Sequence, residues 1–229
     1  MKTLVALAFA CLITLDLTAQ TQVQSDEGWG EWRELFDGKT FTNWILLDTG
    51  EPPTQGWEIQ EGVLHKQQGV RGGNLASTET YDQFELEWEW KISPRGNNGI
   101  KYFVVPERGR GIGHEYQMID DATVGANHAT GKTGGFYDIL APDETLKSYR
   151  IGDWNHSRIV ARGDHVQHWL NGKKVLDYQL GSDEVLQSIA KSKFKSVPNF
   201  GKRVKGHILL TDHVDEVFYR NIRIRVPVE

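Results

Sequence analysis

The stretch Phe84-Glu85-Leu86-Glu87-Trp88-Glu89-Trp90-Lys91-Ile92 decides the fold class of this chain. Apolar residues alternate with three glutamates and a lysine over nine positions, which is typical of a β-strand with one face in the core and one in water. Similar runs follow at 99–105, 115–119, 155–161, 165–170, 174–180, 207–210 and 216–226. Asn171-Gly172 separates two of them and is a dipeptide typical of tight β-hairpins.

One later segment has helical spacing instead. Ser182-Asp183-Glu184 opens it with capping residues, apolar residues recur from Val185 to Ala190, and Pro198 stops it. Many short strands with glycine-rich turns and a single helix predict an all-β fold, a sandwich or a barrel, in one domain.

The composition narrows the classes of partner. A formal net charge of −5 argues against a nucleic-acid-binding protein. The cluster Lys191, Lys193 and Lys195 is interpreted as a solvated surface segment. The histidines lack the spacing of a zinc site, and Gly131-Lys132-Thr133 lacks the spacing of a phosphate-binding loop, so we expect no metal and no cofactor.

The N-terminus has the pattern of a secretory signal peptide. Met1-Lys2 precedes an apolar run from Leu4 to Leu17 and then Thr18-Ala19-Gln20. We therefore expect a signal peptide at 1–19, a linker at 20–30 and the folded domain at 31–229. The run is too short to span a membrane, and it contains Cys11, the chain's one cysteine, so the exported protein is expected to lack disulfides. The expected location is the periplasm or the exterior.

The richest polar pattern is His114-Glu115-Tyr116-Gln117-Met118-Ile119. Alternation places Glu115 and Gln117 on one face of a strand, and the tyrosine and methionine on the other. A carboxylate beside an amide within a strand is unusual on a face that is merely solvated.

Other polar residues could join this pair. We place Glu89 and Lys101 on neighbouring strands in the same phase, and Asp212 and His213 at a strand end across the sheet. Together they predict a polar site able to transfer protons near neutral pH, the alternative being a plain charged outer sheet.

The position of each tryptophan in the alternating pattern of its strand predicts whether its ring faces the core or the solvent. Trp88 and Trp90 share the apolar phase of their strand and are expected in the core, as is His168, in phase with Val166 and Leu170. Trp169 faces the other way, where it offers a flat apolar surface to a sugar ring, unless a neighbouring loop covers it.

Seven short motifs occur in order and together resemble one family. They are Leu35-Phe36-Asp37-Gly38-Lys39-Thr40 with Trp44, Gly96-Asn97-Asn98-Gly99-Ile100, Glu115-Tyr116-Gln117-Met118-Ile119-Asp120, Gly134-Gly135-Phe136-Tyr137 with Ala141-Pro142, Trp154-Asn155-His156, Trp169-Leu170-Asn171-Gly172, and Thr211-Asp212-His213 with Phe218-Tyr219-Arg220-Asn221-Ile222. The series resembles the 3-keto-disaccharide hydrolases, also described as 3-keto-glucoside-1,2-lyases and 3-keto-2-hydroxy-glucal hydratases, from about Glu31 to Val226. The resemblance implies a concanavalin-A-like jelly-roll sandwich of two antiparallel sheets that binds carbohydrate on its concave sheet. The sequence departs from the family pattern at two places. Lys101-Tyr102-Phe103 replaces the commoner ending of its strand, an apolar residue followed by arginine. Residues 182–206 resemble the insertion of a longer subgroup and are expected to form one wall of the site.

The resemblance also implies a chemistry. A ketone at C3 acidifies the C2 proton of a glycoside, so a base can start an elimination at C1, and water then completes a net hydrolysis. Glu115 is the expected base and His213 the expected acid or second base. Lys101 and Gln117 are candidates to hold the C3 oxygen, and Tyr137 and Trp169 to grip the ring, with Glu89 and Asp212 also in the site. A sugar 3-oxidoreductase is the expected functional partner.

Two rival functions keep the fold. Laminarinase-like retaining glycosidases use paired carboxylates about 5–5.5 Å apart, and Asp120 is out of phase with Glu115 unless a bulge intervenes. A carbohydrate-binding module needs an aromatic face but no acid–base groups. Fold alone does not choose among the three.

Overall fold

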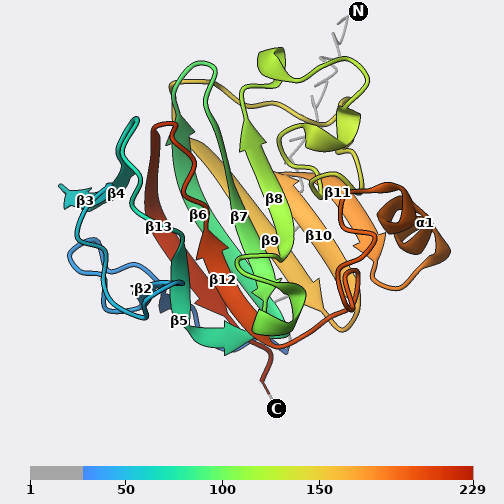
Figure 1. The fold of residues 1–229 in the computed structure, drawn as a ribbon, viewed down its shortest axis with the longest axis horizontal. Coiled ribbons are helices and arrows are strands. Elements are labelled where there is room, and N and C mark those ends of the chain that lie inside the picture. The colour runs from blue at the N-terminus through green and yellow to red at the C-terminus, as the bar shows by residue number, and fades with distance from the viewer. Residues whose placement is uncertain (1–27, 229) are drawn as a thin grey trace, which may run out of the picture.

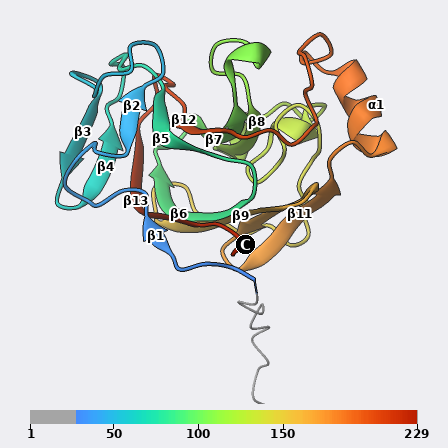
Figure 2. The ribbon, with the colours of Figure 1, turned by 90° about the horizontal axis from the view of Figure 1, so that it is seen from below.

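The computed structural model describes residues 28–228, which form two antiparallel β-sheets packed face to face (Figure 1, Figure 2). The larger sheet has eight strands, of which β1 (Arg33–Glu34) pairs with β13 outside the main order. The others follow the spatial order β11 (Lys173–Gln179), β10 (His165–Leu170), β9 (Asn155–Arg162), β6 (Phe84–Ile92), β13 (Val217–Arg225), β4 (Val63–Lys66) and β3 (Trp57–Gln60).

The smaller sheet has five strands and faces the viewer in Figure 1. Its order is β2 (Trp44–Leu46), β5 (Leu75–Tyr81), β12 (Gly206–Leu210), β7 (Asn97–Val104) and β8 (His114–Ile119). One α-helix, α1 (Asp183–Lys191), and three short 3₁₀ helices, η1 (Pro106–Arg108), η2 (Asp121–Thr123) and η3 (Ala129–Gly131), complete the described elements. Figure 2 shows α1 on one flank of the five-stranded sheet, and β3 and β4 of the larger sheet beside its other edge, next to β2.

The core lies between the sheets and is rich in aromatic rings. Trp88 and Trp90 of β6 are fully buried there, and so are Tyr116 and Met118 of β8. The rings of Trp88 and Tyr116 meet edge to face at 5.0 Å, and the Trp88 indole N–H points at the Met118 sulfur at 3.4 Å. These contacts fix the direction of both strands, because residues that alternate with them must face outward.

The strand pattern from residue 84 onward is confirmed. Each predicted strand is present with ends that move by two residues at most, and Phe84–Ile92 and His165–Leu170 match at both ends. The helix begins at Asp183, with the Ser182 hydroxyl accepting from the Val185 N–H, but it ends at Lys191, well before Pro198. The sequence patterns did not predict β1 to β5, which are mostly shorter and less regular.

The N-terminal boundary is earlier than predicted. Trp29 forms a β-bridge with Pro227, and the Gly30 N–H donates to the Val226 carbonyl at 2.8 Å. The end of the predicted linker is therefore part of the fold. The predicted signal peptide lies outside the described residues. No helix between residues 28 and 228 is long and apolar enough to cross a membrane.

Candidate active site

The pairing of β7 with β8 builds the centre of the site. Lys101 lies opposite Glu115 and Gly99 opposite Gln117 in this antiparallel register. Tyr116 and Met118 fill the core, so Glu115 and Gln117 face outward from the five-stranded sheet together, as the alternation predicted.

Glu115 is an unusual outward-facing carboxylate because it is nearly enclosed. It keeps 7% of its exposure, and within residues 28–228 no donor makes a hydrogen bond to its carboxylate. Burial raises the pKa of Glu115, and the nearby cations of Lys101 and Lys193 only oppose that rise. A carboxylate in such surroundings is a stronger base than one in water and holds a proton closer to neutral pH.

Gly99 explains how the carboxylate fits against its neighbouring strand. A Cβ at this position would lie 2.9 Å from Cγ of Glu115 and would collide with its Oε1. The glycine is therefore needed for space, and its motif belongs to the site although it carries no reactive group.

Gln117 is held beside this carboxylate. Its amide Nε2 donates to Oδ1 of Asn97 at 3.3 Å, and only 2% of the residue is exposed. The Asn97 backbone N–H in turn donates to Asp215 at 3.0 Å, so the end of β7 is tied to the segment after β12.

The segment 134–137 runs along the free edge of β8. The Tyr137 N–H donates to the Glu115 carbonyl at 3.1 Å, and Gln117 exchanges backbone hydrogen bonds with Gly134 and Gly135. Phe136 bridges to Tyr116 and is buried, so Tyr137 faces the opposite way, beside Glu115. Tyr137 is half-buried, so part of its surface is open to solvent.

The insertion 182–206 brings a cation to the same place. The Lys193 N–H donates to Asp138 at 3.0 Å, and Gly201 donates to the buried His114 ring at 3.1 Å. The Lys193 ammonium lies 4.2 Å from the centre of the Tyr137 ring. The insertion therefore places a cation beside Tyr137, and the charge of this cation acts on Glu115.

His213 and Asp212 follow β12 but differ in role. His213 is half-buried, and burial together with the Lys101 charge lowers its pKa. The Asp212 carboxylate accepts from the Gly72 and Gly73 N–H groups at 3.0 and 2.8 Å and lies 3.0 Å from the buried Lys66 ammonium. Asp212 thus organises the loop below the site and has little freedom to bind substrate.

Two predicted site residues lie on the wrong sheet. Glu89 belongs to β6 and Trp169 to β10, so both lie on the outer face of the eight-stranded sheet, away from Glu115. Glu89 accepts from the guanidinium of Arg220 and from Asn221, and the Trp169 ring stacks on Arg158 at 4.3 Å. Alternation gives a side chain's phase within its own strand, but it does not say which sheet the strand joins, and this is why the prediction failed.

Sequence reasoning also missed a residue. The sequence pattern predicts that Lys193 is one of several solvated lysines. It is the Lys193 N–H bond to Asp138 and the Gly201 bond to His114 that place Lys193, and not its neighbours, beside Tyr137. No signal in the sequence distinguishes it from Lys191 or Lys195. As for metals, the described part of the chain contains no group of three or more histidine, cysteine, aspartate or glutamate residues that could hold one.

Known proteins resemble this chain in sequence and in fold. A curated 3-keto-disaccharide hydrolase of Bacteroides thetaiotaomicron is 29% identical over 226 residues, covering 84% of this chain and 77% of the relative. The crystal structure of a glycosyl hydrolase candidate from Parabacteroides distasonis ATCC 8503 superposes with a TM-score of 0.74 at 30% identity, covering 86% of this chain and 94% of that one.

More distant structures share only the fold. The κ-carrageenase of Pseudoalteromonas carrageenovora has a TM-score of 0.55 at 10% identity and covers 92% of this chain and all of its own. The family model described as the 3-keto-alpha-glucoside-1,2-lyase-like domain matches residues 31–225, which include Lys101, Glu115, Tyr137 and His213. On this match over most of its length, and with the jelly-roll sandwich in place, the chain belongs to the 3-keto-alpha-glucoside-1,2-lyase-like domain family.

Proposed function

We propose that this protein cleaves the glycosidic bond of 3-keto-glycosides, starting with removal of the C2 proton by Glu115. The observation that carries the proposal is the nearly enclosed Glu115 carboxylate, which has no hydrogen-bond donor within residues 28–228 and has Lys101 as its cross-strand neighbour. Family membership and the Bacteroides thetaiotaomicron relative support the substrate class.

The proposed reaction needs a base more than it needs a strong acid. Glu115 takes the proton from C2, and the electron pair left on carbon moves toward the C3 ketone to give an enolate. The C3 ketone then re-forms, a C1–C2 double bond appears, and the glycosidic oxygen leaves C1 and takes a proton from water. Water then adds across this bond, with oxygen at C1 and a proton at C2, and the sum is hydrolysis.

Lys101 is placed to hold the enolate oxygen. Its ammonium donates one hydrogen bond to the Gly111 carbonyl at 3.1 Å, which leaves two of its three N–H groups for a ligand. A cation that meets negative charge as it develops lowers the barrier more than one that binds the ground state. Gln117 lies two residues beyond Glu115 on the same face of β8 and is the second candidate for this oxygen.

His213 fits the hydration step better than the role of a strong acid. Burial and the Lys101 charge lower its pKa, so the imidazole is neutral near pH 7 and can accept a proton from water. Since Glu115 holds the C2 proton after the first step, it is also the group that can return a proton to C2.

The retaining-glycosidase alternative lacks its second carboxylate at the expected positions. Asp120 accepts from the backbone N–H groups of Ala122 and Arg95, at 3.1 and 2.9 Å, so it shapes the turn after β8. Glu89 lies on the other sheet. A binding module, for its part, gains nothing from an enclosed carboxylate without a hydrogen-bond partner.

The test combines one substitution with isotope labelling. Glu115→Gln should lower the turnover of 3-keto-trehalose about 10²–10⁴-fold, the usual cost of losing a general base. Thermal stability should stay the same or rise, because a charge without hydrogen-bond partners is removed from a nearly enclosed place. Glu51→Gln, on the exposed surface, is the matched control.

Product formed by the wild-type protein in deuterated water should carry deuterium at C2, since C2 is reprotonated by a group that exchanges with solvent. Unoxidised trehalose should stay intact. Near-normal turnover by Glu115→Gln, or product without C2 deuterium, would count decisively against the elimination route.

We also propose that the protein acts outside the cytoplasm and downstream of an enzyme that oxidises sugars at C3. The first proposal rests on the signal-like sequence at 1–19, and the second on the chemistry, because the C3 ketone must be made before the C2 proton becomes acidic.

A further inference from the structure

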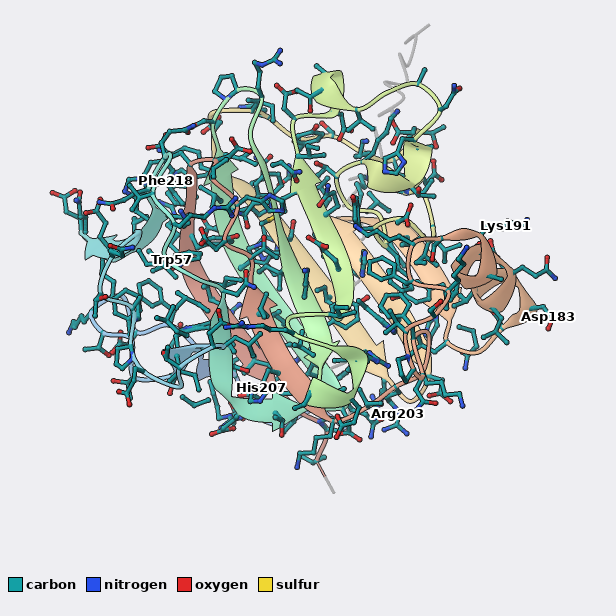
Figure 3. All side chains as sticks on the ribbon, in the orientation of Figure 1. Trp57, Asp183, Lys191, Arg203, His207 and Phe218 are labelled. Atoms are coloured by element: carbon teal, nitrogen blue, oxygen red, sulfur yellow. The ribbon has the colours of Figure 1, made fainter. Side chains whose placement is uncertain are left out.

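A cavity opens on the same outer face of the five-stranded sheet as Glu115, where β7 ends and β12 begins. Its volume is about 420 Å³, and its wall is mainly apolar, with Leu47, Val104, Val105 and Pro106. His207, labelled in Figure 3 near the beginning of β12, also lines it. Nothing in the proposed reaction uses this cavity.

A β-bulge turns this part of β7 toward the cavity. Between the pairs Lys101–Leu209 and Val104–His207, β7 advances three residues while β12 advances two. The extra residue is absorbed at Phe103, whose φ of 56° is left-handed, and both Tyr102 and Phe103 point into the core. Val104 therefore faces the side of Lys101, which is how bulges beside active sites redirect a side chain.

The cavity and the catalytic groups share a wall. Gly111 lines the cavity, and its carbonyl accepts from the Lys101 ammonium. Three residues of strand separate Lys101 from Val104, a distance of about 10 Å. A group attached through C1 of a sugar bound at Glu115 could reach the cavity over this distance.

The wall favours an apolar occupant over a second sugar. A sugar ring carries hydroxyls around its edge, and each one that enters without a hydrogen-bond partner loses its hydration. Nδ1 of His207 is already bonded to the Ser77 carbonyl at 2.7 Å, and the exposed Arg110 pairs with Asp48. Few polar groups of this wall are therefore left to form hydrogen bonds with the hydroxyls of a sugar.

Resting on the proposed function, we propose that this cavity is the leaving-group subsite and that it selects 3-keto-glucosides whose aglycone is a compact apolar ring. The leaving group enters the apolar cavity while the keto sugar stays between Glu115 and Lys101.

The experiment compares aglycones of similar acidity, so that leaving-group chemistry does not decide the rates. Cyclohexylmethyl and ethyl 3-keto-glucosides are prepared as both anomers. The wild-type kcat/KM should be at least about tenfold higher for the cyclohexylmethyl compound than for the ethyl compound.

Val105→Trp, which fills the cavity, should abolish this preference by raising KM for the cyclohexylmethyl compound. Leu186→Trp adds the same ring to an exposed face of α1 and should leave the preference intact. Circular dichroism and thermal melting check that both variants fold.

Binding of the unoxidised cyclohexylmethyl and ethyl glucosides, measured by titration calorimetry, tests the cavity independently of turnover. The cyclohexylmethyl glucoside should bind more tightly, and Val105→Trp should remove the difference. Equal affinities, or a difference that survives Val105→Trp, would overturn the subsite. If neither keto-glucoside is cleaved, the proposed reaction fails, and the binding comparison still decides the cavity.

Discussion

At the residue scale, the position of the Glu115 carboxylate, the proposed base, depends on Gly99, a neighbour that has no reactive group of its own. Gly99→Ala would place a methyl group against the Glu115 carboxylate, the flexible end of a side chain, which can move at little cost to the fold. A displacement of about 1 Å of a catalytic group typically costs about 10²-fold in rate. We therefore expect kcat/KM for a 3-keto-glycoside to fall by about that factor while the melting temperature changes little.

Gly125→Ala is the control for this substitution, because a Cβ there meets nothing within 4 Å and the backbone φ is ordinary. If the two alanine variants have the same activity, the space at Gly99 does not matter for catalysis.

The Lys193 cation tunes the same carboxylate. It opposes the rise in the pKa of Glu115, so Lys193→Met should raise that pKa further. A base must be deprotonated to act, and the acidic limb of kcat/KM should therefore move to higher pH. Lys195→Met, two residues along the same exposed segment, is the control. An unchanged acidic limb in Lys193→Met would mean that the two groups do not interact.

At the element scale, the loop from Val70 to Asn74 is held by a buried ion pair. Lys66 is fully buried, and its charge faces Asp212 at 3.0 Å while also donating to backbone carbonyls. Asp212→Asn leaves this cation without its counter-charge, which typically destabilises a protein by about 3–5 kcal/mol. Urea denaturation measures the loss.

The double variant Lys66→Met with Asp212→Asn should recover part of this stability, because no unpaired charge remains in the core. Strictly additive effects of the two substitutions would argue that the pair is not coupled.

At this scale the sequence patterns predict which way the side chains of a strand point, but not which sheet the strand joins. The alternation of β6 and β8 predicted their directions correctly, because a strand with one buried face has a period of two. The same rule placed Glu89 and Trp169 with Glu115, since it carries no information on which sheet a strand joins. The bulge at Phe103 and the docking of Lys193 were also out of reach, because both arise from contacts between distant segments.

At the scale of the whole molecule, polar groups join the two sheets through the core. His168 of β10 is fully buried, and its ring nitrogens lie 3.0 Å from the Tyr102 hydroxyl of β7 and 3.0 Å from the Gly134 carbonyl. Tyr102 also contacts the hydroxyl of Tyr178, at 2.5 Å. The Trp90 indole N–H and the Tyr116 hydroxyl meet at Ser157, at 2.8 and 2.9 Å. The face of β7 and β8 opposite Lys101, Glu115 and Gln117 is therefore tied to the eight-stranded sheet, which holds the outer face in register.

This arrangement makes the stability of the fold depend on pH. Burial lowers the pKa of His168 to about 4, against an ordinary value near 6.5, and it lowers the pKa of His114 as well. Between these two pH values the histidines are protonated in the unfolded chain but stay neutral in the folded chain. The free energy of unfolding therefore falls as the pH drops from about 6.5 to about 4. For His168 alone the loss amounts to about 3 kcal/mol.

Urea denaturation at a series of pH values should therefore show a steep decline over this interval, and His168→Gln should flatten it, since its amide can still bond to Tyr102 and Gly134 without titrating. His128→Gln, at an exposed histidine, should keep the wild-type slope. Because Glu115 has a raised pKa, its own contribution has the opposite sign: it is most favourable at low pH and is lost as the carboxylate ionises. Glu115→Gln should consequently stabilise the fold more at neutral pH than at pH 4, whereas a gain of equal size at both would show that the enclosed carboxylate carries no desolvation cost.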